Sequence, residues 1–251
     1  MLIDTHAHVN FKAFAQDSDE VIKRCLENQV WLINVGSQYA TSQKAVAMAE
    51  KYPQGVYAAI GLHPIHALDG FKTAAYRQLL SSKKVVAIGE IGLDYKKEYL
   101  SFKEEQKKVF LEQMKLAQEA NLPIIFHCRQ AHQELIRIIT NFQLPISKLR
   151  GVVHCFTGNW SVAQEYLKMG LSLGFNGIIF KLNLDKVIKQ TPLERILLET
   201  DCPYLTPPPM EGRNEPLYVK YVAERIAQIK NLSYEEIIKT TTANAQFLFN
   251  L

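Results

Sequence analysis

Eight short apolar segments, spread along the whole chain, constrain its fold more than any other feature of the sequence. Most are almost continuously apolar, a pattern typical of parallel strands that are covered on both faces. Helical stretches separate them, so we predict an α/β fold, a (β/α)8 TIM barrel, with an open doubly wound sheet as the alternative. The eight segments are residues 2–6, 31–36, 56–61, 85–90, 123–127, 151–155, 171–175 and 196–200.

Capping signals mark where the intervening helices begin. The longest predicted helix covers residues 102–121. Elsewhere, a serine or aspartate followed three residues later by glutamate or glutamine has the spacing of a capping box, which opens a helix. These pairs are Asp17 with Glu20, Ser161 with Gln164, and Ser233 with Glu236.

The chain has 251 residues and no linker, repeat or low-complexity segment, so we predict a single domain over residues 1–251. Four prolines within residues 203–209 follow the eighth apolar segment, which predicts a stiff loop beside an active site. Lysine and arginine exceed aspartate and glutamate by 29 − 25 = 4. This mild excess permits an anionic substrate without requiring one.

Three features predict a cytoplasmic protein. The N-terminus lacks a basic stretch followed by an apolar core, and no apolar run is long enough to cross a bilayer. None of the four cysteines forms a C-x-x-C pair, and a disulfide framework is not expected in a chain of this length. We therefore expect no association with a membrane and no obligate protein partner.

Six residues of metal-ligand type stand at or just past the C-terminal ends of predicted strands. In a barrel these ends meet at one face, where the active site lies. The first two are separated by one residue, so both can face the same side of an extended segment. Six side chains exceed what one catalytic ion with an open position needs, so two divalent ions fit better than one. The six are His6, His8, Glu90, His127, His154 and Asp201.

Such a centre predicts a hydrolase. A carboxylate such as Glu90 can bridge two ions, and two cations roughly 4 Å apart can hold both the entering and the leaving oxygen of a phosphoryl displacement. Three cysteines directly follow proposed ligands, and strand alternation predicts that they face the helices as small buried side chains. They are Cys128, Cys155 and Cys202.

Six motifs, taken in order, resemble those of TatD-type metal-dependent deoxyribonucleases. The motifs are DTHAHVN at 4–10, GLHP at 61–64, GEIGLDY at 89–95, HCR at 127–129, HCFTG at 154–158 and ETDCPYLTPPP at 199–209. The resemblance covers essentially the whole chain. It implies an amidohydrolase-type barrel that uses two divalent ions to hydrolyse phosphodiester bonds in DNA.

The resemblance also implies a role for each ligand. Asp201 would accept or orient the proton of the attacking water, and Glu90 would bridge the ions, so these two are the expected catalytic residues. Asp4, Asp94 and Glu199 are candidates for orienting the ligands. One ion would be bound by His6, His8 and Asp201, and the other by His127 and His154.

Four further residues are candidates for binding the substrate phosphate: His63, Arg129, Arg213 and Tyr95. Arginine suits this task because its planar guanidinium can hold two phosphate oxygens at once. Three of the four have an alternative. His63 can brace the loop after the third strand, Arg129 can pair with an acid on a neighbouring helix, and Arg213 can be a solvated loop charge.

We predict that the protein is a metal-dependent deoxyribonuclease that acts as an exonuclease on single-stranded DNA. The alternative is a hydrolase of the same architecture that acts on a small phosphoester, ester or amide. A non-catalytic binding protein would not need an intact two-ion site. The lysine pairs at 83–84, 96–97 and 107–108 form no basic stripe of the kind found in nucleic-acid grooves, so the nuclease prediction rests on the resemblance.

The donor set narrows the choice of metal but leaves its identity open. Imidazole-rich sites suit zinc, manganese, iron or nickel, whereas magnesium prefers oxygen ligands. The resemblance implies that magnesium or manganese supports activity. We therefore expect zinc, nickel or iron in the protein as isolated, and magnesium or manganese during turnover.

Overall fold

Eight parallel strands form one sheet in chain order, from β1 to β8. The structure is a computed structural model that describes residues 1–142 and 149–251. Each strand pairs in parallel with the next, as in a (β/α)8 barrel. The strands are β1 (Leu2–Ala7), β2 (Val30–Val35), β3 (Val56–Ile60), β4 (Val85–Asp94), β5 (Ile124–Arg129), β6 (Gly151–Val153), β7 (Ser172–Phe175) and β8 (Ile196–Leu198).

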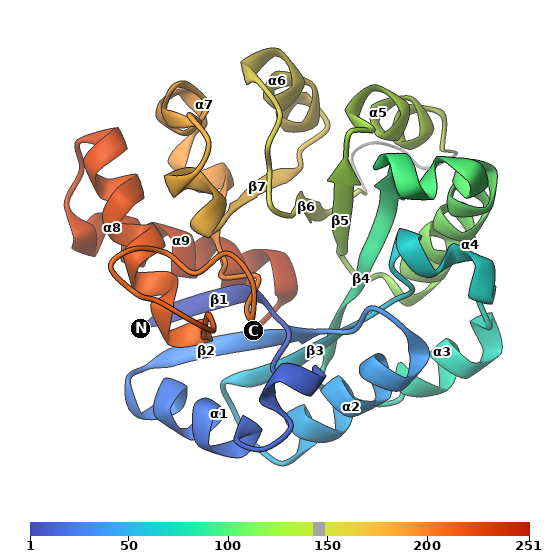
Figure 1. Cartoon of the computed structure of the whole chain (residues 1–251), viewed down its shortest axis with the longest axis horizontal. Coiled ribbons are helices and arrows are strands. Elements are labelled where there is room, and N and C mark those ends of the chain that lie inside the picture. Colours follow the sequence, from blue (N-terminus) through green and yellow to red (C-terminus); the bar gives the residue numbers. More distant parts are fainter. Residues whose placement is uncertain (143–148) are drawn as a thin grey trace.

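The helices lie around the outside of the sheet (Figure 1). None of those in the described part of the chain is long and apolar enough to cross a membrane. The predicted helix over 102–121 is confirmed as α4. The helices are α1 (Ser18–Glu27), α2 (Tyr39–Glu50), α3 (Thr73–Leu79), α4 (Lys103–Ala120), α5 (His132–Asn141), α6 (Trp160–Lys168), α7 (Asp185–Gln190), α8 (Val219–Lys230) and α9 (Tyr234–Phe249).

The first and last strands close the sheet into a barrel. The Asp201 amide donates to the His6 carbonyl at 2.8 Å, and the His8 amide donates to the Cys202 carbonyl at 2.9 Å. The buried Asp4 carboxylate adds a side-chain link, since it accepts from the Thr200 amide at 2.9 Å and from its hydroxyl at 2.6 Å. An open doubly wound sheet has no such closure, so the barrel prediction is confirmed and the alternative is wrong.

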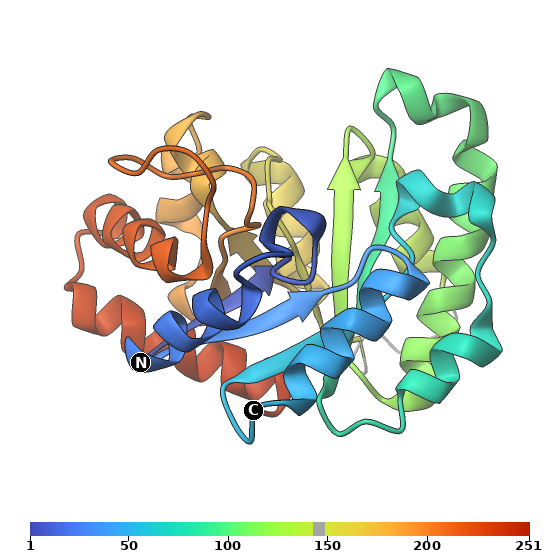
Figure 2. The same cartoon turned by 60° about the horizontal axis from the view of Figure 1, so that its bottom comes forward.

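Apolar side chains fill the barrel interior, and α9 covers its lower end. Ile125, Val152 and Leu197 belong to the interior cluster, together with Leu248 and Phe249 of α9. Figure 2 shows α9 (red) below the strands, at the end from which β4 and β5 rise. Side chains two residues apart on a strand face the same way, so His127, two positions after Ile125 on β5, points into the upper part of the barrel. His154 and Glu199 stand directly after the last residues of β6 and β8, at the same end of the barrel.

Strand β4 runs four residues further than predicted, to Asp94. Its register shifts between Gly89 and Ile91, so Glu90 lies at an irregularity within the strand and does not end it. The pairing with β5 continues because Gly92 lets the two backbones approach closely. A Cβ at Gly92, where φ is +145°, would lie 2.0 Å from the His127 carbonyl oxygen. Strands β6 and β8 end two residues earlier than predicted.

Of the three predicted capping boxes, only that of Ser233 forms the predicted cap hydrogen bond. The Ser233 hydroxyl accepts from the Glu236 amide at 3.1 Å and opens α9. Helix α6 is capped by Asn159, which accepts from the Val162 amide, so the prediction at Ser161 was wrong by two residues. Asp17 is the residue before α1, but its side chain does not cap the helix.

The link between Asp4 and Thr200 generates a stability prediction. Replacing Asp4 with alanine leaves the buried Thr200 amide and hydroxyl without an acceptor, and each unsatisfied group costs about 1–3 kcal/mol. We expect Asp4→Ala to lower the free energy of unfolding by about 3 kcal/mol, measured by urea denaturation in the presence of a chelator. Asp19→Ala is the control, because that carboxylate is 59% exposed and its loss is expected to change stability little. A change below about 0.5 kcal/mol in Asp4→Ala would contradict this role.

Candidate metal centre

All six predicted ligands meet at the upper end of the barrel. His6 belongs to β1, and His8 follows that strand directly. Their Nε2 atoms lie 3.1 Å apart. Asp201 Oδ1 lies 3.4 Å from His8 Nε2 and 3.8 Å from His6 Nε2, and Glu90 Oε2 lies 3.5 Å from His6 Nε2. His6, His8 and Glu90 form one group of donor atoms that all lie within 4.8 Å of one another, and Asp201 adjoins this group through His8.

A second group surrounds the other oxygen of Glu90. His127 Nδ1 lies 2.5 Å from Glu90 Oε1, and His154 Nε2 lies 3.5 Å from the same oxygen. His63 joins them, with Nε2 at 3.6 Å from Glu90 Oε1 and 3.1 Å from His127 Nδ1. The two carboxylate oxygens of Glu90 therefore face different sets of imidazoles, which is the arrangement expected of a bridging ligand.

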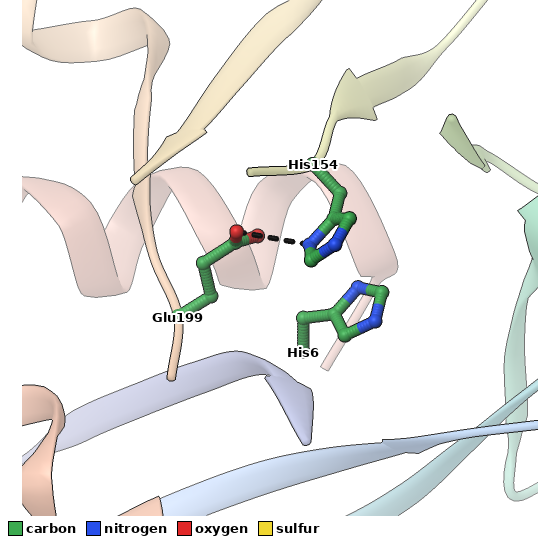
Figure 3. A group of neighbouring side chains, drawn as sticks. All are labelled: His6, His154 and Glu199. Carbon is green, nitrogen blue, oxygen red and sulfur yellow. Dashed lines mark ion pairs between the residues drawn. The ribbon is translucent and has the colours of Figure 1, made fainter. Parts of the chain in front are cut away.

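His154 lies close to both groups. Its ring stacks on that of His6 at a centroid distance of 3.6 Å, and its Nε2 is 3.9 Å from Asp201 Oδ1. On the other side, Glu199 Oε1 is 2.9 Å from His154 Nδ1 (Figure 3). Gly174 leaves room for this carboxylate, since a Cβ there would lie 2.4 Å from Glu199 Oε2.

Oxygen atoms contact the second ring nitrogen of two other imidazoles, those of His8 and His127. His8 Nδ1 lies 2.8 Å from the Val35 carbonyl oxygen, so it carries the proton and leaves Nε2 free to coordinate. Asp94 Oδ2 lies 3.2 Å from His127 Nε2. The orienting roles considered for Asp94 and Glu199 have this geometric support. Asn176, which donates to Glu199 at 3.0 Å, was not anticipated, and no motif identifies it.

The carboxylates control the protonation of two imidazoles. Burial alone lowers the pKa of His127, but Glu90 and Asp94 outweigh it and raise that pKa to about 9. Burial also opposes charge on His154, yet Glu199, Glu90 and Asp201 raise its pKa to about 10. The centre thus attracts positive charge strongly, which protons or metal cations can supply.

The donor set fits divalent metal ions. Imidazole nitrogens and carboxylate oxygens are the ligands of zinc and related metals. Among the buried polar atoms of the site, His6 Nδ1 and Glu199 Oε2 have no hydrogen-bond partner within residues 1–142 and 149–251, and His154 Nδ1 has only its ion-pair contact with Glu199. The strands place donor atoms of His6, His8 and Glu90, and those of His63, Glu90 and His127, within 4.8 Å of one another.

The cysteines follow the prediction except at one position. Cys128 and Cys202 are buried. Cys155 is only partly buried, and its Sγ lies within 4.8 Å of ligand atoms of His154 and Asp201. It faces the centre because β6 has already ended and its φ is +45°, so strand alternation no longer sets its direction.

A cavity of about 700 Å³ opens beside the metal ligands. Two of the four predicted phosphate-binding residues, His63 and Arg129, line it. An apolar wall, not anticipated from the sequence, lines it too. The wall consists of Phe11, Ile178, Leu182, Tyr204 and Leu205. Tyr204 could have been identified, because it lies three residues after Asp201 in the proline-rich loop.

Arg213 and Tyr95 are not among the residues that line this cavity. The Arg213 guanidinium forms ion pairs with Asp17 at 2.5 Å and with Glu215 at 2.9 Å, and it lies 4.2 Å over the Phe14 ring. These contacts also explain why Asp17 does not cap α1. Tyr95 is half-buried and packs against the core. The geometry therefore gives no support to phosphate binding by either residue.

Comparisons with known proteins point to one family. Residues 3–250 match the family described as TatD related DNase. An uncharacterized metal-dependent hydrolase of Bacillus subtilis, YabD, is 45% identical, and the 3'-5' ssDNA/RNA exonuclease TatD of Erwinia tasmaniensis is 35% identical, each over the full length of both chains. The crystal structure of YJJV, a TatD homologue from Escherichia coli, superposes with a TM-score of 0.90 at 32% identity, covering 100% of this chain and 98% of the other. The chain belongs to the TatD-related DNase family of metal-dependent hydrolases.

Proposed function

We propose that this protein is an exonuclease that removes nucleotides from the 3′ end of single-stranded DNA with two divalent ions. The observation that carries the proposal is the position of Glu90, whose two oxygens face separate sets of ligands. The substrate and the polarity come from the relatives about 35% identical to this chain, which are named 3'-5' ssDNA/RNA exonucleases.

Two ions would be held by the six ligands, with His63 close to the second group. When bound, they would lower the pKa of a water molecule and neutralise charge on the phosphate. Asp201 is positioned to accept the proton, since it lines the cavity. Burial alone would raise the pKa of Asp201, but His154, His8 and His6 outweigh it and hold the pKa below its usual value. The carboxylate is therefore ionised at neutral pH, which is the form that would bind a metal ion and orient the attacking water.

Arg129 is the residue we assign to the substrate phosphate. It is the last residue of β5, it is exposed, and it lines the cavity. The alternative was an ion pair with an acid on a neighbouring helix, and none is found within the described residues. A guanidinium without a carboxylate partner can hold two phosphate oxygens without first breaking another interaction.

Metal binding tests the bridging role of Glu90. We expect the metal-free parent to bind two Mn²⁺ ions per chain in a calorimetric titration. Glu90→Ala is expected to weaken binding of both ions at least tenfold. Loss of a residue that only hydrogen-bonds to a metal ligand already weakens metal binding by roughly tenfold or more, and Glu90 would itself be a ligand. Glu98→Ala, a change of a carboxylate that is 59% exposed, is the matched control. A single ion per chain in the parent, or parental affinity in Glu90→Ala, would contradict the proposal.

Nuclease activity tests the substrate. We expect the parent to shorten a 5′-labelled single-stranded oligonucleotide from its 3′ end, and to act more slowly on a duplex. A chelator or Glu90→Ala should reduce the rate by at least about 100-fold, because the activated water would be lost. The products would be resolved on a denaturing gel. A protein that binds two ions but degrades neither DNA nor RNA would favour the small-substrate alternative.

Substitution of Arg129 tests the phosphate contact. Arg129→Ala should raise KM for the oligonucleotide about tenfold, since a hydrogen bond to a charged group contributes about 1.5–3 kcal/mol. The same change should make KM less dependent on salt. Arg137→Ala, which removes a 63% exposed arginine from α5, is the control. If KM and its salt dependence both match the parent, Arg129 does not bind the phosphate.

A further inference from the structure

The residues that line the cavity are of two chemical kinds. The imidazoles and carboxylates of the metal centre are one kind, and the apolar side chains described above are the other. A phosphate group alone has no apolar surface to place against such a wall. A nucleotide has both a phosphate and a flat, weakly polar base, so it can contact both kinds of residue at once.

Tyr204 presents the most exposed ring of this wall. Its side chain is 55% exposed, and it takes part in no aromatic pair within the residues that the structure describes. Phe11 differs, because its ring stacks on His8 at 4.2 Å with an interplanar angle of 18°. Phe11 therefore covers a ligand, whereas the Tyr204 ring is available to a substrate.

The backbone that carries Tyr204 is firmly held. The Tyr204 amide donates to the Asp201 carbonyl at 3.0 Å. Its carbonyl accepts from Asn214 Nδ2 at 2.6 Å, and the same buried nitrogen donates to the Thr200 carbonyl at 3.0 Å. A ring on a fixed backbone loses little conformational freedom on binding, which favours its use as a recognition surface.

The ring also lies beside the metal ligands. Tyr204 lines the same cavity as Asp201 and Glu90, and its amide donates to the Asp201 carbonyl. A base placed on this ring would thus adjoin the phosphodiester held at the metal centre. Leu182, 44% exposed, lies on the same wall and can contact the edge of the base or its sugar.

We infer that Tyr204 stacks against the base of a nucleotide adjoining the scissile phosphodiester. This inference rests on the proposed nuclease function and adds how the substrate is recognised. Every base has a flat face, so stacking on Tyr204 would tolerate any sequence. It would also favour single strands, because a base in a duplex must first leave its partner before it can stack on the protein.

The test uses two single-stranded oligonucleotides of equal length. One is an ordinary DNA strand, and the other has abasic residues at its last two 3′ positions. On the ordinary strand, Tyr204→Ala should raise KM by roughly five- to 150-fold, which is the range for loss of one base–aromatic stack. Tyr204→Phe keeps the ring and should resemble the parent. On the abasic strand, the parent and Tyr204→Ala should have the same KM.

Phe247→Ala is the matched control, since that ring on α9 is 84% exposed and does not line the cavity. Metal affinity is measured for every variant to show that the centre is intact. An unchanged KM in Tyr204→Ala, an equal loss on both strands, or weakened metal binding in this variant would overturn the stacking role while leaving the nuclease proposal in place. A parent that cleaves neither strand would overturn the nuclease proposal first.

Discussion

The hydrogen bonds between β1 and the segment after β8 are the interaction on which the centre depends. They place His6 and His8, near the start of the chain, against Asp201, near its end. Each strand supplies only one or two ligands, so no local segment can form the site alone. Closure of the barrel turns residues almost 200 positions apart into neighbours within ligand distance.

The gathered ligands make the upper end of the barrel electrostatically unfavourable by itself. Glu90 and Glu199 are buried carboxylates, and burying a charge is costly unless an opposite charge compensates it. Imidazoles that bind protons supply part of this compensation, and metal cations can supply more. The apolar interior below, closed by α9, stabilises the fold without a ligand.

The sequence predicted the fold and the convergence of the six candidate ligands because both depend on regular spacing. Apolar strands repeat along the chain, and a ligand at a strand end converges with the others whatever its distance in sequence. Interactions between particular side chains could not be predicted in this way. The ion pair between Arg213 and Asp17 joins residues 196 positions apart, and no pattern in the sequence predicts it. Cys155 turns inward through a positive φ, and Glu90 lies at a register shift, both of which depend on packing between neighbouring strands.

The shape of the cavity bears on the choice between a polymer and a small substrate. A small ligand is usually enclosed, with most of its surface buried by the protein. Here the apolar wall continues outward into residues that stay exposed, Tyr204 at 55% and Leu182 at 44%. A substrate that used this surface would extend from the metal centre toward solvent. The metal centre would then determine which bond of the polymer is cleaved. The apolar wall would bind the adjoining part of that polymer without sequence specificity.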